Sequence, residues 1–228
     1  MVKNDSFLDK QIENKPLRER IADVLRASIL QADLKPGDAI VETALAAELG
    51  VSRAPLREAL QILNTEGLIE IIPYHKTTVR ALRRQDIEEL YSLRSVLETF
   101  AAQQLIDMGS EQAITRLTEI QQAMVEAADS NSIQDVSKFD HQFHDAIIQA
   151  SQHNLLIATW GNISLRVRQV LALRDMHRTD IKQMVLSHQP IIDAIAAQNS
   201  ALAAQRIHQH IAIAGEFVVK VWDQRAAD

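Results

Sequence analysis

The most informative absence in this sequence is cysteine, which occurs nowhere in its 228 residues. Without thiols the chain can form neither disulfide bridges nor thiolate metal sites, and we expect a reducing, cytoplasmic location. Long apolar runs are also missing, since no stretch approaches the roughly 18 uncharged apolar residues of a membrane span. The polar N-terminus lacks the apolar core of a signal peptide. We therefore expect no membrane partner.

Positive charge is scarce overall, because 24 Lys and Arg stand against 30 Asp and Glu, for a formal net charge of -6. The balance is uneven: residues 1–84 hold 13 basic and 12 acidic side chains, whereas residues 85–228 hold 11 and 18. A near-neutral first part can present a basic face to nucleic acid, while an acidic second part would lie away from phosphates. Seven of the eight histidines lie in the second part, which indicates a different chemistry there.

Apolar spacing in the first part predicts three helices followed by a β-hairpin. The first helix spans 17–34 and carries Ile21, Val24, Leu25 and Ile29 on one face. Two shorter helices are predicted over 41–49 and 52–66, and two strands over 68–72 and 77–82 flank a turn at 73–76. We therefore expect an N-terminal domain at 1–82, a linker at 83–85 and a second domain at 86–228.

From residue 86 onward the pattern is helical, with no convincing strand. Six helical segments are predicted, at 86–108, 110–129, 132–151, 154–174, 180–197 and 200–224. Their short connections favour antiparallel neighbours. Pro190 should loosen or kink the fifth segment, because proline lacks the N–H that the helix needs.

Two short helices joined at Gly50 have the spacing of a helix-turn-helix, whose second helix enters the major groove of DNA. Ser52 is a suitable N-cap for that helix, and its hydroxyl can also reach a phosphate. Arg53 and Arg57 share the face opposite a packed leucine stripe. Arginine matches guanine edges and phosphates, so the turn, cap and hairpin together favour DNA contact over a merely solvated helix face. The predicted fold is mainly α, with an N-terminal winged helix-turn-helix and a C-terminal all-α antiparallel six-helix bundle.

Polar side chains interrupt the apolar faces of three predicted helices in the second part. Asp140 and His144 fall within the apolar arc of one helix, while His188 and His210 are each surrounded by apolar residues of another. Burying these groups without partners would cost several kcal/mol. A divalent metal would satisfy all four, and Asp with His suits Zn²⁺, Ni²⁺ or Mn²⁺. The alternative is that Asp140 bonds one histidine and the others are ordinary core residues.

Arg94 also lies among apolar positions, with Glu98 four residues further on. The two could simply form a helix ion pair. Alternatively, Arg94 faces the bundle interior and binds an anionic ligand, because guanidinium grips a carboxylate through two parallel hydrogen bonds. By contrast, His141 and His208 fall on the polar sides of their helices, and we expect them to be solvated.

Residues 17–79 resemble the winged-helix domain of the GntR family of bacterial transcription regulators. The similarity rests on the segment 42–60 and on Glu66-Gly67-Leu68-Ile69. It implies DNA contacts by Thr43, Ser52, Arg53, Ala54 and Arg57. The family usually has glycine at the tip of the wing, where this chain has Lys76. Lys76 would supply a phosphate contact instead, or else the turn at 75–76 is plainly solvated.

The second part resembles the FCD ligand-binding domain of the FadR-type branch of that family. The similarity is carried by the segments 94–98, 140–144 and 153–155, with His188 and His210. Many members hold a metal through one Asp and three His, which implies that role for Asp140, His144, His188 and His210, with Zn²⁺ as the first expectation. Asn154 matches a frequent Asn and is expected at the effector site; a helix N-cap is the alternative. Six helices rather than seven suggest the shorter, VanR-like subgroup.

The sequence therefore predicts a ligand-responsive transcriptional regulator, not an enzyme, that binds a pseudo-palindromic operator as a homodimer. A small carboxylate-type effector would bind the metal and Arg94, and repression relieved by this effector is the expected mode. Three alternatives stay open: a metal-dependent hydrolase, a regulator that senses the metal itself, and a purely structural metal. A hydrolase would need a general base, and no free carboxylate in the bundle stands out for that role.

Overall fold

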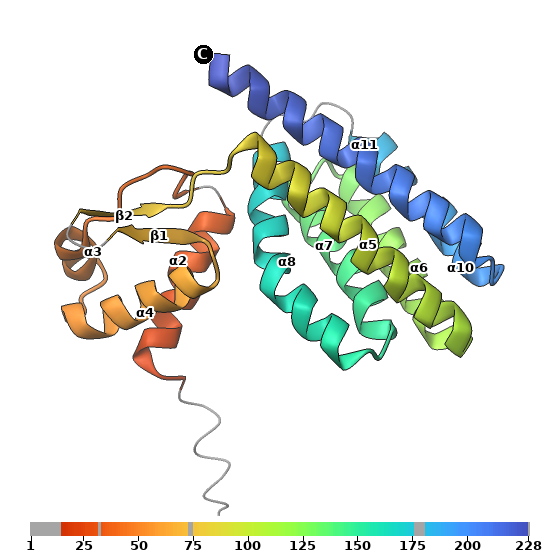
Figure 1. Ribbon diagram of the computed structural model, residues 1–228, viewed down its shortest axis with the longest axis horizontal. Coiled ribbons are helices and arrows are strands. Elements are labelled where there is room, and N and C mark those ends of the chain that lie inside the picture. Colours follow the sequence, from red (N-terminus) through yellow and green to blue (C-terminus); the bar gives the residue numbers. More distant parts are fainter. Residues whose placement is uncertain (1–14, 32, 73–74, 176–180, 228) are drawn as a thin grey trace, which may run out of the picture. The chain divides into compact units, whose positions relative to one another are not determined.

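The computed structural model describes residues 15–31, 33–72, 75–175 and 181–227, and it is mainly α, as predicted. The chain divides into two compact units, one up to Ala81 and one from Leu82 onward (Figure 1). No helix in the described part of the chain combines the length and apolar character that crossing a bilayer needs.

The described residues of the first unit form three helices and a two-stranded antiparallel sheet. These are α2 (Leu17–Leu30), α3 (Glu42–Glu48), α4 (Arg53–Thr65), β1 (Ile69–Ile72) and β2 (Lys76–Val79). Ile69 pairs with Val79 and Ile72 with Lys76, so the strands form the predicted hairpin. Pro73 and Tyr74 of the predicted turn lie outside the described residues.

Helix α2 packs on α4 through aliphatic side chains at helical spacing. Ile21, Leu25 and Ile29 are buried, but Val24, which the pattern placed with them, is 52% exposed. The predicted apolar face was therefore too wide. The helix also ends at Leu30 rather than at residue 34, because the amides of Asp33 and Leu34 both donate to the carbonyl oxygen of Ser28 and close a turn.

The second unit is a bundle of helices without a strand among its described residues. The helices are α5 (Arg84–Met108), α6 (Glu111–Asp129), α7 (Ile133–Ala150), α8 (Asn154–Asp175), α9 (Ile181–Leu186), α10 (Gln189–Ala196) and α11 (Ser200–Ala227). Helix α11 lies along α5, and α7 packs on α6 (Figure 1). Arg83 is the N-cap of α5, so two of the three predicted linker residues are helical, and Leu82 packs into the core of this unit.

The predicted fifth helix of the bundle is divided into α9 and α10 at Ser187 and His188. Pro190 lies in the first turn of α10, where it has no N–H to continue the ladder from α9. His188 keeps right-handed helical dihedral angles, φ -81° and ψ -33°, so the chain is interrupted rather than reversed. The described bundle thus has seven helical segments where six were predicted, and a VanR-like subgroup inferred from six stays a prediction.

Candidate functional site

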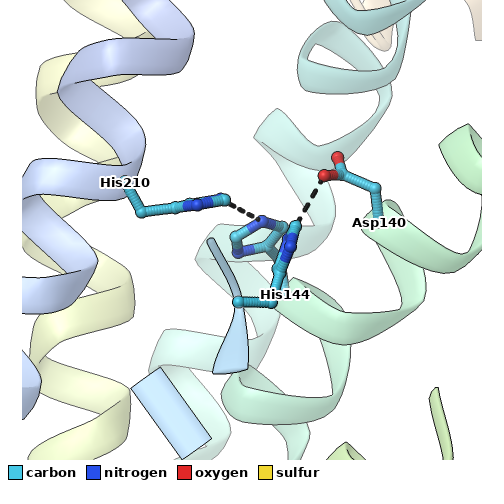
Figure 2. A group of neighbouring side chains, drawn as sticks. Asp140, His144 and His210 are labelled. Atoms are coloured by element: carbon cyan, nitrogen blue, oxygen red, sulfur yellow. Dashed lines mark hydrogen bonds and ion pairs between the residues drawn. The ribbon is translucent and has the colours of Figure 1, made fainter. Parts of the chain in front are cut away.

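Four buried side chains from three places in the bundle meet in one cluster. Asp140 and His144 come from α7, His188 from the break between α9 and α10, and His210 from α11. One ligand-type atom from each lies within 4.8 Å of all the others. Figure 2 shows Asp140, His144 and His210 pointing toward one another. The exposed fractions are 1%, 1%, 0% and 7%, so these groups are shielded from bulk solvent.

The protonated nitrogen of His188 follows from its backbone neighbours. Its Nδ1 lies 3.2 Å from the carbonyl oxygens of both Met184 and Val185. Carbonyl oxygens only accept hydrogen bonds, so Nδ1 carries a proton, and Nε2 is the nitrogen left to bind a metal, which it does in the neutral form of the ring. That Nε2 lies 3.3 Å from Oδ1 of Asp140. Gln121 on α6 donates to the same Val185 oxygen at 2.8 Å and so helps to hold the interrupted turn.

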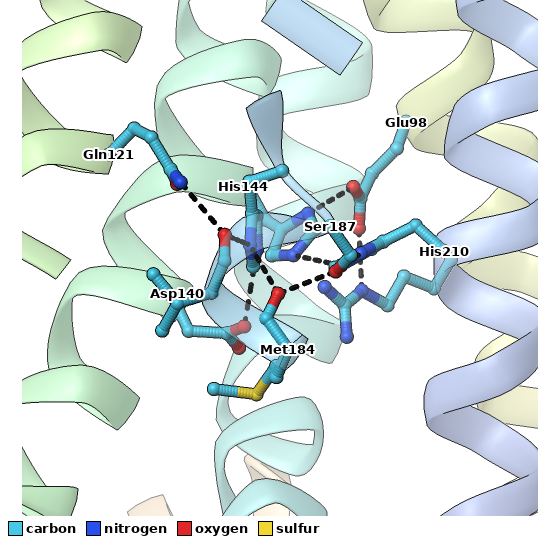
Figure 3. Close-up of polar contacts among 10 residues, drawn as sticks. Glu98, Gln121, Asp140, His144, Met184, Ser187 and His210 are labelled. Atoms are coloured by element: carbon cyan, nitrogen blue, oxygen red, sulfur yellow. Dashed lines mark hydrogen bonds and ion pairs between the residues drawn. The ribbon is translucent and has the colours of Figure 1, made fainter. Parts of the chain in front are cut away.

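His144 has the same tautomer for a different reason. Its Nδ1 lies 2.5 Å from Oε2 of Glu98, which is fully buried on α5 (Figure 3). Burial alone would raise the pKa of Glu98, but His144 and Arg94 together bring it below its ordinary value. An ionised carboxylate only accepts, so His144 donates from Nδ1 and its Nε2 lone pair faces the cluster.

His210 completes the set through Ser187. The Ser187 hydroxyl donates its single proton to the carbonyl oxygen of Met184, at 2.5 Å. It can therefore only accept from Nδ1 of His210, 2.9 Å away (Figure 3). Nε2 of His210 is then unprotonated, and it lies 3.3 Å from Nε2 of His144.

The cluster therefore directs three imidazole Nε2 atoms and one carboxylate to a common point, and each Nε2 offers a lone pair when its ring is neutral. Burial, followed by the positive charge of Arg94, lowers the pKa of His144, and burial with His188 lowers that of His210. Neutral histidines facing one another in this way repel unless a cation lies between them. The 3.3 Å between the two Nε2 atoms is close to the roughly 3.4 Å between neighbouring ligands of a tetrahedral zinc site. The residues present fit a divalent metal.

Arg94 lies beside the cluster, in the bundle interior; it makes the predicted pair with Glu98, and its binding of an anion stays a prediction. Its Nε donates to Oε1 of Glu98 at 2.6 Å, which is the predicted helix pair. Its side chain is only 1% exposed, and Nη2 has no hydrogen-bond partner among the described residues. A buried guanidinium N–H without an acceptor is costly, so this end of Arg94 is suited to an anion.

Other polar residues differ from the expectations. Asn154 is exposed as the first residue of α8, and it is not the N-cap, because the amide of Leu156 donates to Nδ1 of His153. It shares no hydrogen bond with the cluster in the described structure. His141 is half-buried rather than solvated, and burial followed by the charge of Arg168 lowers its pKa to about 4. His208 is exposed, as expected, and lies 3.1 Å from the Ser95 hydroxyl.

Three residues of the network were not predicted as site residues: Glu98 in this role, Gln121 and Ser187. Glu98 and Gln121 carried a readable signal, because each is a polar residue on an apolar helix face. Ser187 carried none, because its contact with His210 depends on the interruption between α9 and α10.

The residues predicted to contact DNA lie on α3, at the N-cap and in the first turns of α4, and at the start of β2. Gly50 makes the turn with φ +65°, a left-handed conformation that favours glycine. Ser52 is the N-cap of α4, yet its exposed side chain makes no capping hydrogen bond. Arg57 Nε donates to Oε2 of Glu42 at 2.8 Å, and Arg53 Nη2 lies 3.6 Å from the same oxygen. Thr43, Ala54 and Lys76 are exposed as well.

The sequence matches two family models, one for each unit. Residues 89–213 match the FCD domain, and residues 17–79 match the bacterial regulatory proteins of the gntR family. The chain is 31% identical over 218 residues to the gluconate operon transcriptional repressor of Bacillus subtilis (strain 168), with 89% of this chain and 85% of that protein covered.

Two solved structures share the fold. E. coli McbR/YncC has a TM-score of 0.77 at 18% identity and covers 93% of this chain and 100% of its own. The Zn²⁺-bound FCD domain of TM0439 has a TM-score of 0.50 at 21% identity and covers 61% of this chain and 96% of its own. The family models and the curated relative support a transcriptional regulator rather than the hydrolase that the sequence left open. The chain belongs to the GntR family of bacterial regulatory proteins, as a DNA-binding transcriptional regulator whose second unit is an FCD domain.

Proposed function

We propose that this regulator represses transcription as a homodimer on a pseudo-palindromic operator, and that a small anionic metabolite releases it by binding at a metal site in the bundle. The observation that carries the proposal is the convergence of three histidine Nε2 atoms and the Asp140 carboxylate next to the buried Arg94. A cation and an anion would together satisfy groups that the fold leaves facing one another.

Asp140, His144, His188 and His210 are the proposed metal ligands. Zn²⁺ is the first candidate, because nitrogen and carboxylate ligands suit it, and Ni²⁺ or Mn²⁺ are alternatives. The FCD domain of TM0439, which shares this fold, is Zn²⁺-bound, so the fold is able to hold that ion. Bound here, the metal would supply a positive centre for an oxygen atom of the effector.

The charges of the site favour an anionic effector. Asp140 and Glu98 contribute two negative charges, Arg94 one positive charge, and a divalent metal two more, while histidines bind a metal in their neutral form. The loaded site would carry a net positive charge inside an apolar bundle, where burying it is costly. A small carboxylate would lower that charge and give Nη2 of Arg94 its missing acceptor. Asn154, exposed on α8, stays a predicted effector contact.

Operator binding is assigned to Thr43, Ser52, Arg53, Ala54, Arg57 and Lys76. Their shared exposure on α3, α4 and the wing supports this assignment. A dimer would place two such surfaces on successive half-sites. Helix α5 carries an apolar stripe suited to pairing two copies, because Leu93, Val96 and Phe100 are 43%, 65% and 43% exposed.

Helix α11 connects the proposed metal site to Leu82, the residue at which the second unit begins. It carries His210, and twelve residues later Trp222, whose indole N–H donates to the carbonyl oxygen of Leu82 at 2.8 Å. Leu82 comes just before the N-cap of α5. A displacement of α11 caused by the effector would therefore act on the segment that enters the bundle. The effector can act only through different affinities for the two arrangements.

The test is a thermal-shift screen of metabolite acids on Zn²⁺-loaded protein, with Arg94→Met and, as control, Arg84→Met, an exposed arginine on the same helix. Each compound that binds is then added to the protein on a duplex selected from a random pool, and DNA release is followed by fluorescence anisotropy. We expect an acid that stabilises the wild type and Arg84→Met, but not Arg94→Met, and that releases the DNA. If no acid distinguishes Arg94→Met, the effector site is wrong. If chelation alone releases the DNA, the metal itself is the signal.

A further inference from the structure

One carboxylate joins the proposed metal site to the proposed anion site. Glu98 is fully buried, and each of its oxygens has its own partner (Figure 3). Oε2 accepts from Nδ1 of His144 on α7, and Oε1 accepts from Nε of Arg94 one turn earlier on α5.

On the His144 side, Glu98 determines which nitrogen can bind a metal. The carboxylate requires a proton on Nδ1, so the Nε2 lone pair must face the cluster. A carboxylate on the far side of an imidazole also makes its free nitrogen a stronger ligand, and loss of such a partner typically weakens metal binding by about 10–100-fold.

On the Arg94 side, Glu98 determines which part of the guanidinium is left for a ligand. It engages Nε, while Nη2 stays buried and without a partner among the described residues. Since the guanidinium is rigid and planar, fixing Nε fixes the direction of the remaining donors.

We propose that Glu98 is a positioning residue that couples metal binding to anion binding by sharing one negative charge between His144 and Arg94. The inference rests on the proposed function. A cation on Nε2 of His144 polarises the ring and strengthens its Nδ1–H bond to Glu98. The carboxylate then neutralises Arg94 less, and the free end of Arg94 attracts an anion more strongly. Coupling is reciprocal, so an anion on Arg94 strengthens metal binding by the same factor.

The test uses Zn²⁺ alone and measures its affinity by competition with a chromogenic chelator on the full chain. Glu98→Gln keeps the size of the side chain and should weaken Zn²⁺ binding by about 10–100-fold. Glu89→Gln, a matched change at an exposed glutamate of α5, should leave it unchanged. Arg94→Met should have the opposite effect and tighten Zn²⁺ binding, because Glu98 is then left to His144 alone. A merely structural role would weaken binding in both variants.

A double-mutant cycle isolates the coupling. The tightening caused by Arg94→Met should be smaller by at least about twofold when Glu98 is already Gln. Effects of Arg94→Met that are the same in both backgrounds would overturn the coupling. Unchanged affinity in Glu98→Gln would overturn the positioning role but leave the metal site in place. Absence of Zn²⁺ binding by the wild type would overturn both the proposed function and this inference.

A measurement on the wild type keeps the inference falsifiable if the buried variants do not fold. Long-range ¹H–¹⁵N spectra of Zn²⁺-loaded protein should show His144 protonated on Nδ1 and metal-bound through Nε2. Metal bound through Nδ1 would overturn the inference, because Glu98 could not then contact that nitrogen.

Discussion

Trp222 donates its indole N–H to the carbonyl oxygen of Leu82, 140 residues earlier in the chain, at 2.8 Å. This bond ties the last helix of the bundle to the residue with which the bundle begins. The same helix supplies His210 to the cluster. A ligand near His210 and the segment at Leu82 are therefore joined by one continuous element.

Replacing Trp222 tests this connection. Trp222→Phe keeps an aromatic ring but removes the donor with the pyrrole part of the indole, and it should lower the free energy of unfolding by at least about 1 kcal/mol. Zn²⁺ affinity should stay unchanged, while the difference in DNA affinity between Zn²⁺-loaded and chelated protein becomes smaller. Asp223→Asn, which breaks only an exposed pair with Arg84, is the control and should have little effect. An undiminished response in Trp222→Phe would contradict the proposed route.

His210 and His208 provide a matched pair for the metal site, because they lie two residues apart on α11, one buried in the cluster and one exposed. Zn²⁺ should stabilise the wild type by about 2.7 kcal/mol at a free concentration 100 times its Kd. His208→Ala should keep this gain, and His210→Ala should lose most of it. Thermal unfolding with and without Zn²⁺ measures both. Equal gains in the two variants would refute the ligand assignment.

Glu42 should weaken DNA binding, because its carboxylate forms ion pairs with Arg57 and Arg53, two of the residues proposed to contact DNA. Exposed ion pairs are worth up to about 1 kcal/mol. Glu42→Gln should therefore tighten DNA binding by roughly two- to fivefold, whereas Arg57→Met should weaken it and reduce its salt dependence. Glu48→Gln removes the same charge elsewhere on α3. Equal tightening in Glu48→Gln would show that only net charge matters.

Gly215 allows α11 to approach α5 closely. A Cβ atom at this position would lie 3.0 Å from Cδ1 of Tyr91, whose ring is buried. Gly215→Ala should cost about 1–3 kcal/mol from overpacking, which exceeds the gain of about 1 kcal/mol in helix propensity. In Gly161→Ala on α8, the added Cβ would have no atom within 4 Å, so this change should stabilise the protein instead. Chemical denaturation compares the two, and stabilisation by both changes would argue against tight α5–α11 packing.

Asp86 gives a pH-dependent contribution to stability. Its hydrogen bonds from the Arg83 side chain and backbone outweigh desolvation and lower its pKa to about 2. Because the folded value is below the unfolded one, this contribution is complete above about pH 5 and is lost as the pH falls toward 2. Asp86→Asn should cost about 1 kcal/mol at pH 7. The cost should shrink as unfolding is measured at lower pH; a constant cost would exclude the ionised cap.

Much of the site was predictable because its residues break the pattern of their own helices. Asp140, His144, His188 and His210 each lie where an apolar residue belongs, and so does Arg94. Glu98 was seen only as the partner of Arg94, since the spacing of four residues on α5 contains no information about α7. The prediction for His141 was wrong because a helical wheel does not report which neighbouring helix covers a polar side.

Local sequence determined what each segment is: helical periods, the Gly50 turn, the interruption near Pro190, and the residue types able to bind metal or DNA. These properties depend on interactions within a few residues, so the chain carries them without its fold. Only the tertiary structure decided which ring nitrogens meet, because Nδ1 of His144 bonds to Glu98 on another helix and Nδ1 of His210 to Ser187 between α9 and α10. The proton positions of these two histidines follow from contacts between segments far apart in sequence, and no periodicity within one helix encodes them.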